Sequence, residues 1–161
     1  MKGARLAALA LGVLAASAQA QVPAAASELT SYALDPTHTF VHWEVLHMNT
    51  STIRGRFDRS SGAVQFDARA QRLDLSISID TSSVNSGVRV LDTLLRGSEM
   101  LDTATSPMAT FVAREARFEG EALRGVLGEF TLRGIRQPLT LTALRWNCRL
   151  NLLFLREVFL A

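Results

Sequence analysis

The chain has 161 residues, of which 17 are Lys or Arg and 15 are Asp or Glu, with three His and one Cys. Lys2 and Arg5 fall in an N-terminal segment that we expect to be removed, and no acidic residue does. The remainder then carries 15 charges of each sign. A neutral chain gives no electrostatic case for binding nucleic acid or an anionic membrane surface, so we expect no nucleic-acid partner.

Residues 1–20 have the pattern of an export signal. After Lys2 and Arg5, the stretch Leu6–Ala16 contains only Ala, Leu, Gly and Val, and Ala18-Gln19-Ala20 is a small-residue cleavage site. This apolar run is too short to span a bilayer. We expect cleavage, export and no stable membrane insertion, with a retained membrane anchor as the alternative. Residues 21–31 are predicted to be a flexible leader and residues 32–161 one domain.

From Tyr32 onward, alternation with a period of two dominates the sequence and predicts β-strands. The clearest case is Arg72–Asp80, where four apolar residues alternate with Asp and Ser. Successive strand side chains point to opposite faces, so this strand has one apolar and one polar face. That pattern is typical of an antiparallel sheet with one solvated face.

The remaining elements are short and separated by turn residues. Strands are predicted at residues 38–48, 54–58, 63–67, 108–118, 122–132 and 139–146, which makes about seven strands in all. Turns are predicted at Ser60–Gly62, at Glu119-Gly120 and between Gly134 and Pro138. The apolar stripe in Val88–Leu101 predicts one helix. Short strands at regular spacing indicate an all-β sandwich or barrel.

The three histidines, His38, His42 and His47, lie close together in sequence. In an extended strand His38 and His42 share a face with Glu44, whereas His47 points to the other side. Side chains next to each other on one face are about 7 Å apart, which is wide for ligands of one ion. We therefore predict no metal site, and expect His42 and Glu44 to lie on the solvated face. A site made of two His and one Glu is the alternative.

No motif for nucleophilic catalysis or phosphate binding is present, so we predict that the protein is not an enzyme. An unrecognised hydrolase or isomerase site stays as an alternative. Cys148 has no partner for an intramolecular disulfide. It is a free thiol, pairs with another chain, or lacks its partner in this sequence.

Four stretches occur in the order seen in one protein family: "YALDPTHTFVHWEVLH", "IRGRFDRSSGAVQFD", "VLDTLLRGSEMLDTATSPMATF" and "LRGVLGEFTLRGIRQPLTL". They cover most of residues 32–148, and in combination they resemble the YceI-like family. The resemblance implies a periplasmic, antiparallel, lipocalin-like β-barrel that binds an isoprenoid quinone or an isoprenyl pyrophosphate. It implies no cofactor other than this lipid ligand, and it leaves a homodimer possible.

The sequence departs from the family pattern in two places. Met100 stands where the family usually has an aromatic residue, and the family continues with further strands beyond the point where this chain ends. We therefore expect a barrel domain that is incomplete at its C-terminus and lacks one or more closing strands. The alternatives to a lipid carrier are a structural or interaction barrel without ligand, and a truncated family member without function.

A barrel of this kind would line its interior with the apolar strand faces. The predicted interior residues are Val41, Trp43, Val45, Ile53, Phe57, Leu73, Leu75, Ile77, Ile79, Phe111, Phe130, Leu132, Leu139 and Leu141. Those predicted to contact the lipid are Val41, Trp43, Val45, Phe57, Leu75, Ile77, Phe111 and Phe130, with His47 hydrogen-bonding the head group. Apolar strand residues are usually core, so core packing is the alternative role for each.

Overall fold

The computed structural model describes residues 29–151 and 156–160. The predicted signal peptide, residues 1–20, and most of the predicted leader lie outside the described residues. The described elements confirm an all-β, antiparallel fold with one α-helix. In chain order they are β1 (Thr30–Ala33), β2 (Val41–His47), β3 (Ser51–Phe57), β4 (Ser60–Asp67), β5 (Arg72–Asp80), the 3-10 helix η1 (Thr81–Ser83), β6 (Val84–Asn85), α1 (Arg89–Arg96), β7 (Met108–Glu119), β8 (Ala122–Leu132), β9 (Ile135–Thr142), β10 (Asn147–Asn151) and β11 (Arg156–Leu160).

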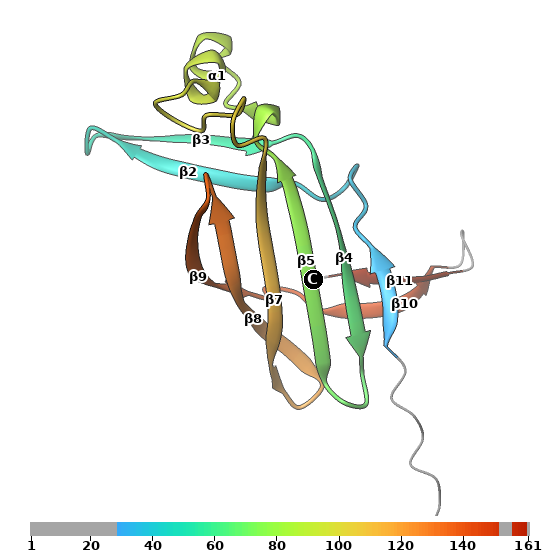
Figure 1. Cartoon of the computed structure of the whole chain (residues 1–161). Helices are drawn as coiled ribbons and strands as arrows, with labels where there is room; N and C mark the ends of the chain where they lie inside the picture. Colours follow the sequence, from blue (N-terminus) through green and yellow to red (C-terminus); the bar gives the residue numbers. More distant parts are fainter. Residues whose placement is uncertain (1–28, 152–155, 161) are drawn as a thin grey trace, which may run out of the picture.

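The strands form three antiparallel sheets (Figure 1). The largest has six strands in the order β1-β4-β5-β7-β8-β9, a second joins β2, β3 and β6, and β10 pairs with β11. In Figure 1 the β2–β3 hairpin runs across one end of the large sheet, and the β10–β11 hairpin also runs crosswise to its long strands. Among the described strands β1 and β9 are the edges of the large sheet, so its hydrogen bonds do not form a closed ring there.

The hydrophobic core lies on one face of the large sheet. The register places Phe66 of β4 opposite Leu73 of β5, and Ile77 of β5 opposite Phe111 of β7. Leu73 and Phe111 keep only 2% and 3% of their surface exposed. Trp146 packs edge-on against Phe66, with ring centroids 5.0 Å apart. Leu73, Leu75 and Ile77 of β5 belong to this core, and Ile79 is buried as well. The burial therefore agrees with the alternation predicted for β5.

The pairing of β7 with β8 is not regular. Arg114 is skipped between the pairs Ala113–Gly128 and Glu115–Leu127, and a second register shift follows later in the same pair. Such β-bulges bend the bulged strand and increase its local twist. In Figure 1 β8 runs obliquely to β5 and β7.

Two segments predicted as turns are strand in the structure, one in full and one in part. Residues 60–62 open β4 and pair with residues 77–79 of β5. Gly62 suits this position because a Cβ there would overlap the carbonyl oxygen of Ser76. Pro138, expected to close a turn, lies inside β9 opposite Glu129. An edge strand tolerates the missing N–H of proline. A turn is present at Arg133 and Gly134, with φ values of 50° and 74°, so only its predicted extension to Pro138 was wrong.

The predicted helix, residues 88–101, is shorter in the structure, because α1 ends at Arg96. The N–H of Gly97 donates to the carbonyl of Leu94 (3.0 Å), and Asp102 has a φ of 48°, so the chain continues in turns. Val90 is 81% exposed and Leu94 59% exposed. Part of the predicted apolar stripe therefore faces solvent. No helix among the described residues has the length and apolar character needed to cross a bilayer.

Candidate functional site

Four predicted site residues lie together on the core side of the large sheet. Leu75 and Ile77 come from β5, Phe111 from β7 and Phe130 from β8. Phe111 is the centre of this group, because it stands opposite Ile77 on one side and opposite Phe130 on the other. Phe111 is buried and the other three are half-buried, so part of their apolar surface remains available.

Four more predicted residues lie on one face of the β2–β3 hairpin, which we call the hairpin face. Alternation along β2 places Val41, Trp43 and Val45 on this face, and Phe57 of β3 joins them as the partner of Val41. Val45 is 56% exposed, and the other three are half-buried. The structure therefore divides the predicted apolar site into two groups, one on each of two sheets.

The indole of Trp43 lies over Gly55, its partner across the hairpin. A Cβ at position 55 would be 2.7 Å from Cε2 of Trp43 and 2.6 Å from the carbonyl oxygen of Asn85. The ring nitrogen Nε1 of Trp43 is buried, and no acceptor among the described residues receives its hydrogen. A buried donor without a partner costs about 1–3 kcal/mol. Sequence alternation finds Trp43 but not this unsatisfied N–H.

His47, the predicted head-group residue, is exposed at the far end of β2, opposite Ser51. The turn that follows has Met48 and Asn49 at φ values of 47° and 55°, and the N–H of Thr50 donates to the carbonyl of His47 (3.0 Å). Same-face positions along a strand repeat about every 7 Å. His47 is therefore about 14 Å along the strand from Trp43, and one oxygen atom cannot contact both.

The opposite face of the hairpin is solvated and charged, as predicted for His42 and Glu44, which are both exposed. Glu44 pairs with Arg54 (3.1 Å). The guanidinium of Arg56 lies 4.4 Å from the ring centroid of Phe40. Both arginines face away from the hairpin face, which agrees with the alternation of the sequence.

The three histidines do not converge. His38 lies in the turn before β2, where its Nδ1 is 2.8 Å from Oδ2 of Asp35. Hydrogen bonds from Thr37 and His38 hold the pKa of Asp35 well below its usual range. His42 and His47 lie on opposite faces of β2. In the part of the chain that the structure describes, no three side chains of the metal-binding types gather around one point.

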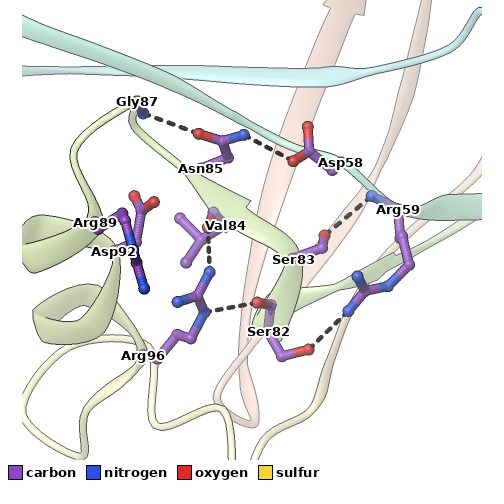
Figure 2. Close-up of a pocket in the computed structure, with 10 residues that line it drawn as sticks. All are labelled: Asp58, Arg59, Ser82, Ser83, Val84, Asn85, Gly87, Arg89, Asp92 and Arg96. Atoms are coloured by element: carbon purple, nitrogen blue, oxygen red, sulfur yellow. Dashed lines mark hydrogen bonds between the residues drawn. The ribbon is translucent and has the colours of Figure 1, made fainter.

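A polar pocket of about 320 Å³ lies beside α1 (Figure 2). Sequence analysis did not predict it, because its residues come from separate segments that each look unexceptional. They are Asp58, Arg59, Ser82, Ser83, Val84, Asn85, Gly87, Arg89, Asp92 and Arg96.

Most of the charged side chains that line this pocket form hydrogen bonds that stabilise the fold. Figure 2 shows Arg96 donating to the carbonyl oxygens of Ser82 (2.7 Å) and Val84 (2.8 Å), which fixes α1 to β6. A hydrogen bond from Asn85 (2.8 Å) lowers the pKa of Asp58. The residues that line the pocket therefore attach α1 to the rest of the fold. The two apolar groups, around Phe111 and on the hairpin face, are the better candidate for binding a ligand.

Comparison with known proteins gives a consistent picture. The model of the YceI-like domain family matches residues 32–153. The Protein YceI of Salmonella newport is 34% identical over 107 residues, which are 66% of this chain and 56% of that protein. The corresponding protein of Escherichia coli O157:H7 is 33% identical over the same length. The chain thus spans little more than half the length of the curated relatives it matches.

Solved structures show the same fold at lower identity. Burkholderia cenocepacia BcnA superposes with a TM-score of 0.62 at 23% identity, covering 73% of this chain and 72% of its own. A polyisoprenoid binding domain from Saccharophagus degradans superposes with a TM-score of 0.51 at 22% identity, covering 76% of this chain and 68% of its own.

Proposed function

Since this chain belongs to the YceI-like family, we propose that it binds a long apolar isoprenoid lipid, either an isoprenoid quinone or a polyprenyl pyrophosphate. The lipid lies against the hairpin face and the half-buried residues around Phe111. The observation that carries this proposal is the gathering of eight predicted contact residues into two apolar faces. The fold shared with the polyisoprenoid binding domain from Saccharophagus degradans supports it.

The physical basis is apolar burial. An isoprenoid tail offers many CH₂-like groups and few hydrogen-bonding groups, and burying each CH₂ contributes about 0.8 kcal/mol. Roughly ten buried groups leave a useful affinity after the cost of immobilising the lipid. Val45, at 56% exposure, is the hairpin-face residue with the largest exposed fraction. His47, beyond it on the strand, is our candidate for a hydrogen bond at the exposed end of the ligand.

We also propose a role as a carrier or store in the periplasm, after export through residues 1–20, and no catalytic role. Several side chains of the types used in catalysis take part in hydrogen bonds within the fold. His38 is bonded to Asp35 at an exposed turn, and the carboxylates beside α1 hold that helix in place.

Val45 and Leu46 provide a matched pair for testing the site. They are neighbours on β2 with exposures of 56% and 60%, and they point to opposite faces. Both Val45→Asp and Leu46→Asp should fold, because neither side chain is buried. Native mass spectrometry of protein purified from the periplasm should show a lipid-sized mass on the wild type and on Leu46→Asp, and little or none on Val45→Asp.

Other results would point elsewhere. If Leu46→Asp loses the lipid and Val45→Asp keeps it, the ligand lies on the opposite face of the hairpin. If all three proteins are folded and carry no lipid that organic extraction can remove, the binding proposal fails. A barrel with a structural or interaction role would then remain. The burial of Phe111 to 3% exposure by its own neighbours would favour that function.

A further inference from the structure

The indole N–H of Trp43 points to a specific chemical feature of the ligand. Trp43 lies on the hairpin face between Val41 and Val45, so it belongs to the apolar surface of the proposed site. Its Nε1 is nevertheless buried without an acceptor from the described residues. Proteins pair most buried polar groups, and an exception calls for a specific explanation.

The ring position is fixed by its surroundings. Gly55 leaves room for the indole, since any side chain there would overlap the ring and the backbone of Asn85. Asn85 is itself held, because β6 pairs with β3 and the Asn85 amide donates to Asp58 (2.8 Å). The N–H therefore keeps one position. Its apolar neighbours on β2 are Val41, which is half-buried, and Val45, which is exposed, so these side chains have room to move aside.

The surroundings also select the charge of an acceptor. The partners on the hairpin face are apolar, whereas Arg54 and Arg56 lie on the opposite face, each next to a carboxylate of Glu44 or Asp58. Burying an anion with no cation beside it costs far more than burying a neutral carbonyl that accepts a hydrogen bond. A pyrophosphate thus fits poorly at Trp43, and a neutral carbonyl oxygen fits well.

We propose that Trp43 Nε1–H donates a hydrogen bond to a neutral carbonyl oxygen of the bound lipid and thereby favours a quinone-type head group over a pyrophosphate. This rests on the proposed isoprenoid-binding function. The tail then extends over the remaining apolar surface, and Trp43 determines specificity while the apolar residues supply affinity. His47 is free to make a separate contact at the rim.

Leu46 offers a matched control, because it lies on the same strand as Trp43, is 60% exposed and points to the opposite face of the hairpin. Affinities of wild type, Trp43→Phe and Leu46→Ala should be measured for decylubiquinone, farnesyl pyrophosphate and squalene. Trp43→Phe should weaken decylubiquinone about tenfold, equivalent to about 1.4 kcal/mol. It should change the affinity for squalene by less than about twofold, since squalene has no acceptor. Leu46→Ala should change neither by more than about twofold.

A direct readout does not depend on how the variants fold. In a proton–nitrogen correlation spectrum of the wild type, the indole signal of Trp43 should move downfield with decylubiquinone and not with squalene. An unmoved indole signal would overturn the inference, as would equal losses of both lipids in Trp43→Phe or tighter binding of farnesyl pyrophosphate than of decylubiquinone. If the wild type binds none of the three probes, the proposed function itself fails, and the inference fails with it.

Discussion

Adding one methyl group at Gly55 tests the packing on which the hairpin face depends. In Gly55→Ala the new Cβ would be 2.7 Å from Cε2 of Trp43 and 2.6 Å from the carbonyl oxygen of Asn85. Asn85 cannot withdraw easily, because its side chain bonds both Asp58 (2.8 Å) and the N–H of Gly87 (2.9 Å). The indole must therefore move. Overpacking of this kind costs about 1–3 kcal/mol, and with two obstructing groups we expect about 2–3 kcal/mol.

Urea unfolding gives the free energy of unfolding for this test. Gly97→Ala is the control, because its Cβ would meet only the Leu94 carbonyl oxygen, at 3.1 Å. In a Trp43→Ala background the penalty of Gly55→Ala should shrink by about 1 kcal/mol or more, since contacting residues are energetically coupled. A Gly55→Ala protein as stable as wild type would refute the reasoning. A penalty unchanged by removing Trp43 would show that the indole is not the obstruction.

Two further predictions concern stability. Phe111→Ala should lower the free energy of unfolding by about 3–5 kcal/mol, because Phe111 is 3% exposed in the centre of the core; a loss below about 1 kcal/mol in urea unfolding would contradict this. Burial raises the pKa of Asp80, but hydrogen bonds from Ser82 and Arg59 outweigh this and leave the pKa below its ordinary value. Such a carboxylate stabilises the folded state above about pH 4 and loses that contribution as the pH falls. Asp80→Asn should therefore lose less stability on acidification than wild type does, and equal acid profiles would count against it.

The strands with the strictest alternation could be predicted from sequence almost to the residue. β5 is Arg72–Asp80, as predicted, because four apolar residues alternate with short polar ones. β8 also has its predicted bounds, Ala122–Leu132. The start of β4 was missed, because Ser60–Gly62 reads locally as a turn and only its pairing with β5 shows it to be strand. Local composition was thus overridden by long-range register.

The candidate site was predictable as a set of residues but not as an arrangement. Alternation placed Trp43 and Val45 on one face of a strand, and the structure agrees. It could not show that the indole lies over Gly55 or that its N–H lacks a partner, because both facts depend on the register of β2 with β3. The pocket beside α1 could not be predicted from local patterns at all, since Asp58, Asn85 and Arg96 come together only in the folded chain.

The bulge at Arg114 changes which residues of β7 face the core. Ahead of the bulge, odd-numbered residues such as Phe111 and Ala113 point to the core, and behind it, even-numbered residues such as Ala116 and Phe118 do so. Arg114 is the extra residue at which the alternation changes, so that apolar side chains from both halves of β7 face the core. A regular pairing that ran through Arg114 without a bulge would turn the second half of the strand inside out and carry its charged side chains toward the apolar interior. Deleting Arg114 would instead make the pairing regular and leave Ala116 and Phe118 on the core face, so the extra residue adds a local bend that the facing of these side chains does not need.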